Sequence, residues 1–212
     1  MAVLSLVGAS RGRPKGLQST LRTIYDTAEF PLEILIRLDE DDPALPEYLD
    51  MDFSFHVGPR LGKGTAQPTN AMAMQAIGDI IMHLSDDQEY ITSAWNTRIL
   101  TVAESFKDAP HAFKVDEGRS QLEHPIVNRA WLNRIGYLYP PELRHLYCDT
   151  FIEVLATQAK CYTTIPDVKI QHHKHKYGDN TSHDARIFAR EDFQNFVKYK
   201  DLINDLALKI AV

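Results

Sequence analysis

Two adjacent carboxylates, Asp86 and Asp87, follow an apolar run of the sequence, IIMHL, at residues 80–84. Carboxylates at the end of a buried strand could hold a hard divalent cation, which takes oxygen ligands and leaves positions free for substrate phosphates. The alternative is an ordinary surface turn, in which aspartate is common. The choice depends on whether other polar residues are brought to the same place.

Two further polar loops follow apolar runs of the same kind. Arg11, Arg13 and Lys15 come after VLSLVGAS at residues 3–10, and DEDDP at residues 39–43 comes after LEILIRL. The guanidinium groups, together with the amides at the start of a following helix, could meet a diphosphate. The alternative for this basic loop is a solvated turn.

The elements that must position these loops are strands and helices in alternation. Apolar strands are expected at residues 3–10, 32–38 and 79–84, with helices at 16–28 and 70–78. Near-continuous apolar strands that alternate with helices indicate a parallel sheet covered on both faces. In such sheets ligands bind beyond the carboxyl ends of the strands, where the strand order reverses. All three polar loops are expected at that edge, which weighs against three independent surface turns.

The second half of the chain is less regular. The final stretch is expected to be helical, and Trp95 and Trp131 are expected in the core. Asp149 is expected to cap the firmest helix of this half, since aspartate is a preferred N-cap residue. The other expected elements are helices at 93–106, 128–137 and 149–160, strands at 111–115, 161–165 and 167–173, and a polar loop at 175–184.

Composition and length favour one ordinary globular domain. The chain has 212 residues, 44% of them hydrophobic, and a formal net charge of -6 that argues against a general nucleic-acid coat. No targeting or membrane-spanning segment is visible, and the two cysteines do not suggest a disulfide scaffold. We therefore expect a cytoplasmic protein with an α/β, Rossmann-like fold, in which helices flank a mostly parallel sheet.

Taken in order, these motifs resemble the nucleotide-sugar glycosyltransferases of the GT-A fold, family 2 in particular. SLVGASRGRPKGLQSTL resembles the first strand and nucleotide loop of that family, and LEILIRLDEDDP resembles its second strand with a base-contacting carboxylate. GKGTAQPTNAMAMQAIGDIIMHLSDD resembles the stretch that leads to the metal-binding Asp-x-Asp. The resemblance implies a single GT-A domain, with a nucleotide-binding half at residues 1–90 and an acceptor-binding half at 91–212.

The resemblance assigns Asp87 as the direct ligand of Mn2+ or Mg2+. The first acid of the family motif falls on Ser85, so one carboxylate is missing or displaced. Asp86 is then expected to face the ribose or to bind the metal through water.

The resemblance also assigns the nucleotide pocket. It implies that Ser10 and Arg11 line the base and ribose, and that Asp39, or Asp41 in its place, accepts from a pyrimidine ring N–H. Lys63 and Asn70 would touch the phosphates or hold their loop; for Lys63 a plain turn is an equal alternative.

Asp149 is similar to the acidic residue that opens the family's acceptor-facing helix and acts as general base. Such a group is required because the acceptor hydroxyl must lose its proton as it attacks the sugar. Cys148 stands where the family usually has another acid, and a plain N-cap is the alternative role.

Three histidines, His172, His173 and His175, lie within four positions near the end of the last expected strand. His173 and His175 point the same way on an extended strand, so one of them could complete the metal shell, as a late histidine does in some relatives. A zinc site with Cys148 or Cys161 would need a C-x-x-C or H-x-x-x-H spacing, which is absent from the sequence.

The function expected from the resemblance is metal-dependent transfer of a sugar from a nucleoside diphosphate sugar, with a uridine donor, to a hydroxyl, inverting the anomeric centre. The acceptor is left open among a small molecule, a glycan, a protein and a modified nucleic-acid base. Two alternatives stand beside it. GASRGRPKG superficially resembles the loop of sugar-nucleotide nucleotidyltransferases, although its glycines are too few, and Ser85 would suit a non-catalytic nucleotide-binding protein of the same fold.

Overall fold

The computed structural model describes residues 2–29, 31–173 and 181–210, the backbone alone for residues 181–187. The strands are β1 (Leu4–Ser10), β2 (Leu32–Asp39), β3 (His56–Gly58), β4 (Ile80–Leu84), β5 (Gln88–Tyr90), β6 (Ala112–Asp116), β7 (Ile126–Asn128) and β8 (Tyr162–His172). The helices are α1 (Pro14–Thr27), α2 (Leu45–Leu49), α3 (Ala66–Gln75), α4 (Trp95–Ala103), α5 (Arg129–Ile135), α6 (Cys148–Gln158) and α7 (Thr181–Ile210), with a short 3-10 helix η1 (Glu104–Phe106).

One eight-stranded sheet, in the order β3-β2-β1-β4-β7-β6-β8-β5, runs through both halves of the chain. β3, β2, β1 and β4 are parallel. A parallel sheet was predicted for β1, β2 and β4, whereas the short β3 was not expected. The second half is mixed, because β7 runs antiparallel to both β4 and β6, and β5 runs antiparallel to β8. Antiparallel neighbours need only a short connection, which suits the short segment between β6 and β7. The result is a single α/β domain with a Rossmann-like sheet.

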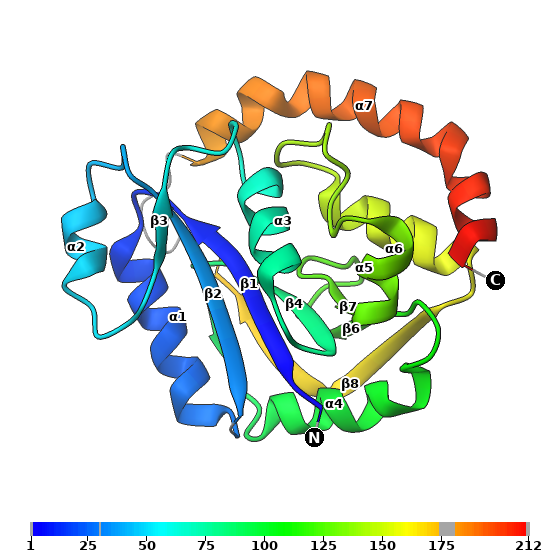
Figure 1. Ribbon diagram of the computed structural model, residues 1–212, viewed down its shortest axis with the longest axis horizontal. Coiled ribbons are helices and arrows are strands. Elements are labelled where there is room, and N and C mark those ends of the chain that lie inside the picture. The colour runs from blue at the N-terminus through cyan, green and yellow to red at the C-terminus, as the bar shows by residue number, and fades with distance from the viewer. Residues whose placement is uncertain (1, 30, 174–180, 211–212) are drawn as a thin grey trace.

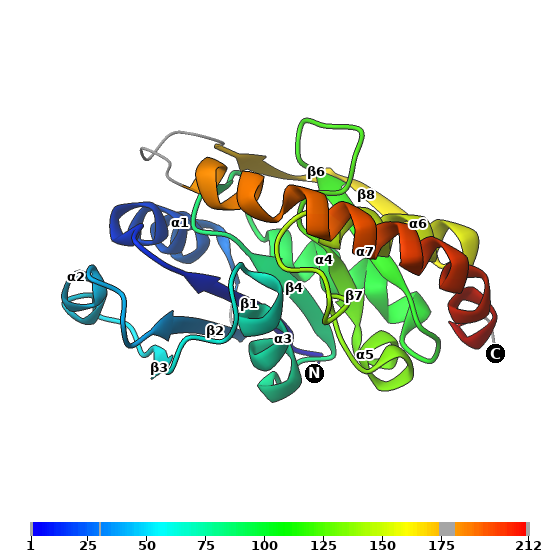
Figure 2. The ribbon, with the colours of Figure 1, turned by 90° about the horizontal axis from the view of Figure 1, so that it is seen from above.

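Helices cover both faces of this sheet (Figures 1 and 2). Alternation along β1 sends Leu4 and Leu6 to the face covered by α1 and α4, and Val7 to the face covered by α3, α5, α6 and α7. Trp95 and Trp131 are fully buried on opposite faces, which confirms their expected place in the core.

Several elements differ from those expected. The helix expected at 70–78 is α3, Ala66–Gln75, and α2, β3 and β5 were not expected. The strands expected at 161–165 and 167–173 form one long strand, β8, with an irregularity in its pairing to β6 between Val115 and Asp116. The polar loop expected at 175–184 falls partly outside the described residues, and α7 already begins at Thr181. Among the described helices, none combines the length and apolar character needed to cross a membrane.

The strand order reverses beside β1, which pairs with β2 on one side and with β4 on the other. Gly8 allows this close approach, since a Cβ at that position would lie 2.2 Å from the carbonyl oxygen of Leu84. The carboxyl ends of β1 and β4, at Ser10 and Leu84, therefore lie side by side. This is where an open α/β sheet binds its ligands.

Helix α7 anchors the segment that precedes α6. The buried carboxylate of Asp192 accepts hydrogen bonds from the backbone amides of Arg144 (2.9 Å), His145 (3.0 Å) and Leu146 (2.8 Å). The carbonyl of Arg144 accepts in turn from the amide of Ala66 at the start of α3, at 3.0 Å. One carboxylate thus links three helices.

We expect Asp192→Ala to lower the free energy of unfolding by about 2 to 4 kcal/mol, because several backbone donors lose their acceptor at once. Urea denaturation measures the change. The matched control is Glu191→Ala, which removes only a half-exposed ion pair with Arg144 and should cost less than about 1 kcal/mol. Equal losses in the two variants would contradict this role for Asp192.

Candidate nucleotide and metal site

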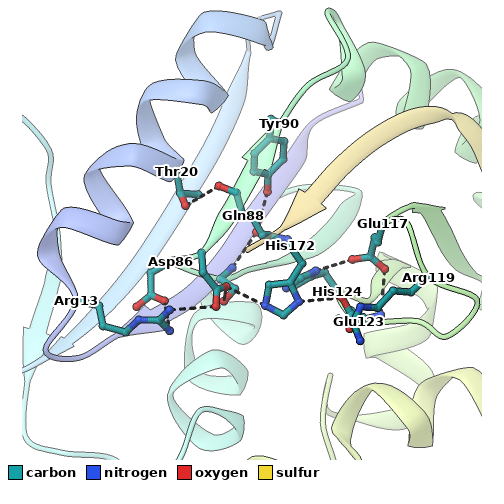
Figure 3. Close-up of polar contacts among 12 residues, drawn as sticks. Arg13, Thr20, Asp86, Gln88, Tyr90, Glu117, Arg119, Glu123, His124 and His172 are labelled. Atoms are coloured by element: carbon teal, nitrogen blue, oxygen red, sulfur yellow. Dashed lines mark hydrogen bonds and ion pairs between the residues drawn. The ribbon is translucent and has the colours of Figure 1, made fainter. Parts of the chain in front are cut away.

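The loops after β1 and β4 meet at the strand-order reversal. The hydroxyl of Ser10 donates to Oδ2 of Asp86 at 2.6 Å. The guanidinium of Arg13 spans the two carboxylates, 2.8 Å from Oδ1 of Asp86 and 3.1 Å from Oδ2 of Asp87 (Figure 3). Both aspartates are buried, so they are not residues of a solvated turn.

The acidic loop after β2 joins the same site. Arg11 contacts Asp39 at 3.0 Å and Asp41 at 2.5 Å, while Arg60 lies 3.7 Å from Asp39. The side chain of Asp39 is 13% exposed and that of Asp41 is 57% exposed, so Asp39 lies deeper. The expected convergence of the three polar loops at one edge is confirmed.

Tyr48 of α2 is a residue of this site that the sequence analysis did not identify. Its buried hydroxyl lies 2.7 Å from Oγ of Ser10 and accepts from the backbone amide of Arg13 at 2.8 Å. Burial raises the pKa of Tyr48 to about 12, so the hydroxyl keeps its proton. The sequence does not identify this tyrosine, because α2 is too short to show a periodic pattern that would place Tyr48 on one face.

The carboxylate of Asp87 is the most heavily engaged group of the site. Its Oδ1 accepts from Oγ of Ser85 at 2.5 Å and lies 3.1 Å from Nε2 of His172. Burial acts to raise the pKa of Asp87, but the contacts with His172, Ser85 and Arg13 outweigh it and hold that pKa well below its usual range. Burial acts to lower the pKa of His172, and its contacts with Asp87 and Glu123 outweigh that effect, so its pKa is raised.

The histidine beside Asp87 is His172, not the expected His173. His173 turns its ring toward Glu89, at 2.5 Å, and only its backbone amide bonds to the carbonyl of Asp87, at 2.8 Å. His175 lies outside the described residues. His172 shares the inward face of β8 with Val168 and Ile170, which are buried, so the phase of the strand would have selected it.

The segment between β6 and β7, residues 117–124, supplies groups that the sequence analysis did not identify. Nδ1 of His124 lies 2.5 Å from Glu117, and Nδ1 of His172 lies 2.8 Å from Glu123 (Figure 3). One ligand atom each of Asp87, His124 and His172 lies within 4.8 Å of the others. A carboxylate oxygen with two imidazole nitrogens is a donor set that fits a divalent metal ion. The sequence signal that could have identified this segment is its charged residues, which lie between the apolar runs of β6 and β7.

Asn70 bonds to a loop of the second half of the chain, and Lys63 lies in an exposed segment. The side chain of Asn70 accepts from the amides of Leu138 (3.1 Å) and Tyr139 (2.8 Å) and donates to the carbonyl of Tyr139 (2.7 Å). Asn70 therefore holds the loop at Leu138 and Tyr139, which is not the phosphate loop considered for it in the sequence. Lys63 is exposed in the segment between β3 and α3.

Asp149 is not the N-cap of its helix, contrary to the expectation. Tyr147, with φ of 65°, occupies that position, and Asp149 lies in the first turn of α6. Its Oδ1 accepts from the backbone amide of Thr150 at 2.6 Å. Burial raises the pKa of Asp149, and the charges of His124 and Glu123 also act on it. The carboxylate is therefore on the side of the site formed by residues 117–124.

Comparisons with known proteins find likeness in structure only. No family model matches the chain, and no curated protein matches it in sequence. Among solved structures, TarS 1-349 of S. aureus in complex with UDP-GlcNAc is similar with a TM-score of 0.62 at 14% identity, over 90% of this chain and 66% of that one. A mannosyltransferase from Pyrobaculum calidifontis, in complex with GDP-Man and Mn2+, is similar with a TM-score of 0.58 at 17% identity, over 83% of this chain and 58% of that one.

The chain thus spans less than two thirds of the length of both structures. At these identities the likeness is one of fold. The chain therefore has a GT-A-like glycosyltransferase fold.

Proposed function

We propose that this protein is a metal-dependent glycosyltransferase that transfers a sugar from a nucleoside diphosphate sugar to a hydroxyl acceptor and inverts the anomeric centre. The observation that carries the proposal is the meeting of Arg13, Asp86, Asp87 and His172 at the carboxyl ends of β1, β4 and β8. Cationic and carboxylate groups at this edge suit a diphosphate and its metal ion. The structural neighbours crystallised with UDP-GlcNAc and with GDP-Man and Mn2+ support it.

The donor would lie along the loops after β1 and β2. Arg11 and Asp39, in contact at 3.0 Å, would face the base, with Asp41 at the exposed rim. Ser10 and Asp86, joined at 2.6 Å, would face the ribose. A uridine donor is proposed because a carboxylate at Asp39 suits the ring N–H of a pyrimidine.

The diphosphate would lie over Arg13 and Asp87. Arg13 pairs with both carboxylates of the site, and its guanidinium could also pair with phosphate oxygens. Asp87 and His172 would hold Mn2+ or Mg2+, which neutralises charge on the departing diphosphate. Lys63, exposed in the segment between β3 and α3, would touch the phosphates or belong to a plain turn.

Asp149 would act as general base for the acceptor hydroxyl. As the acceptor oxygen bonds to the anomeric carbon, the bond from that carbon to the diphosphate breaks, and the diphosphate leaves with the electron pair. The hydroxyl proton passes to the carboxylate of Asp149, whose raised pKa makes it a stronger proton acceptor. Residues 91–212, which carry Asp149, would form the acceptor side.

Removal of the metal-binding carboxylate tests the proposal directly. In the wild type, a uridine diphosphate sugar at 100 times its dissociation constant should stabilise the fold by about 2.7 kcal/mol in the presence of Mn2+, as measured by thermal shift. Asp87→Asn should lose the Mn2+-dependent part of this shift. The control, Asp26→Asn, changes an exposed carboxylate of α1 and should keep it. A normal Mn2+-dependent shift in Asp87→Asn would refute the assignment.

Asp39→Ala should reduce the preference for uridine over other nucleotides, because the partner of the ring N–H is lost. Competition between nucleoside diphosphates for the bound donor measures this preference. The matched control is Asp41→Ala, since Asp41 also pairs with Arg11 but is exposed. If Asp41→Ala changes the preference and Asp39→Ala does not, the base contact belongs to Asp41.

Asp149→Asn should lower transfer by roughly 100-fold to 10,000-fold while donor affinity is kept, because the proton acceptor alone is removed. The same variant should be more stable than the wild type at neutral pH. The raised pKa means that ionised Asp149 costs stability, a cost absent below the ordinary aspartate pKa of about 4 and growing as pH rises through the raised value.

Denaturant unfolding at acidic and neutral pH measures the second effect, and steady-state turnover measures the first. Full turnover in Asp149→Asn would remove the base role. The base would then be sought among Glu142, His145, Asp179 and Asp184.

A further inference from the structure

We propose that Tyr48 is a positioning residue of the donor site, whose buried hydroxyl closes a network of hydrogen bonds that holds Arg13 ready for the diphosphate. The Tyr48 network consists of Tyr48, Ser10, Asp86 and Arg13. The proposal rests on the proposed function and deepens it, since it gives the short helix α2 a part in donor binding. The network joins α2 to the loops after β1 and β4.

The Tyr48 network runs through four short contacts. The backbone amide of Arg13 donates to the hydroxyl oxygen of Tyr48 at 2.8 Å, and that oxygen lies 2.7 Å from Oγ of Ser10. Oγ of Ser10 donates to Oδ2 of Asp86 at 2.6 Å, and Oδ1 of Asp86 lies 2.8 Å from the guanidinium of Arg13 (Figure 3). The network therefore begins and ends on Arg13, so that both the backbone and the side chain of this residue are held.

The donors and acceptors of the network fix the direction of each hydrogen bond. Ser10 has one hydroxyl proton, which it gives to the carboxylate of Asp86. Tyr48 must therefore donate to Ser10, and its oxygen accepts from the amide of Arg13. Burial raises the pKa of Tyr48 to about 12, so the hydroxyl keeps the proton that this arrangement needs. A side chain without a hydroxyl could fill neither role.

Burial makes the Tyr48 network costly to break. Ser10, Tyr48 and Asp86 are all buried, so water does not readily replace a lost partner. The aromatic ring of Tyr48 belongs to the apolar core under α1, and it meets Phe55 edge-on with the ring centroids 6.1 Å apart. Because this packing fixes the aromatic ring, the hydroxyl of Tyr48 is a rigid anchor for the loop after β1.

The segment before α2 holds the same loop at a second point. The buried carboxylate of Asp42 accepts from the amide of Gly12 at 2.8 Å and from the amide of Ala44 at 3.0 Å. The amides of Gly12 and Arg13 are therefore both bonded to side chains that follow β2. A diphosphate at this loop would then be bound by the guanidinium of Arg13 instead of by these two amides.

The affinity for the donor should therefore depend on how well the guanidinium of Arg13 is placed before the donor arrives. Arginine has many rotamers, and a side chain that must be ordered on binding lowers the affinity. The Tyr48 network supplies this order in the free protein. Loss of the Tyr48 hydroxyl should weaken donor binding and raise the KM for the donor, with a smaller effect on kcat at saturating donor.

Calorimetric titration of the full chain with uridine diphosphate in saturating Mn2+ tests the proposal. Tyr48→Phe keeps the buried aromatic ring and removes only the hydroxyl, so the fold should be kept, as circular dichroism checks. The Kd should rise by roughly 5-fold to 30-fold, because Ser10 and Arg13 each lose a buried partner. The matched control is Tyr162→Phe, which loses a contact with Glu153 at 3.3 Å and should keep the wild-type Kd.

Urea unfolding without nucleotide tests the network independently of the proposed function. Tyr48 and Asp86 are joined through Ser10, so the losses in the free energy of unfolding caused by Tyr48→Phe and Asp86→Ala should not add. The losses caused by Tyr162→Phe and Asp86→Ala should add.

The proposal is overturned if folded Tyr48→Phe binds uridine diphosphate with the wild-type Kd, because its effect on stability would then be structural only. Additive losses in Tyr48→Phe and Asp86→Ala would also overturn it. A wild type that binds no uridine diphosphate would contradict the proposed function, and the unfolding measurements would then decide on the Tyr48 network alone.

Discussion

The buried carboxylate of Asp87 is the interaction on which the rest of the site depends. It contacts Arg13 from the loop after β1 and His172 from the end of β8, so it connects the first and the last strand of the chain. A buried carboxylate left without partners would cost several kcal/mol, and the fold must therefore bring both partners to it. The carbonyl of Asp87 also accepts from the amide of His173, which fixes the direction in which β8 ends.

The sheet makes this meeting possible. β1 lies between β2 and β4, and Gly8 lets β1 approach β4 closely enough to set Ser10 beside Asp86. The antiparallel β7 begins at this edge, opposite Met82, and runs away from it, so that His124, which precedes β7, lies next to the carboxylates. A parallel half supplies the loops that are proposed to bind the nucleotide, and a mixed half supplies the histidines and Asp149. The proposed division between donor and acceptor sides follows this change in the sheet.

β1, β2 and β4 could be predicted because each is a largely apolar run followed by charged residues, whereas the three-residue β3 and the short α2 gave no such signal. Parallel strands share one carboxyl edge, so Arg13, Asp39 and Asp87 could be placed together before any contact was known. The site residues of the second half could not be predicted in this way, because the local sequence there is compatible with more than one placement of each side chain. His172 and His173 differ only in the phase of β8, and a left-handed Tyr147 displaces Asp149 from the N-cap. His124 reaches the site because β7 pairs antiparallel with β4, and the local sequence does not predict this pairing.

A crystal of the protein grown with Mn2+ and uridine diphosphate, measured at the manganese absorption edge, tests the central claim most directly. The anomalous difference map should show one strong peak within bonding distance of Asp87 and His172, with the diphosphate beside it and in contact with Arg13. A peak elsewhere, or nucleotide bound away from the ends of β1 and β4, would contradict the assignment of this edge as the donor and metal site.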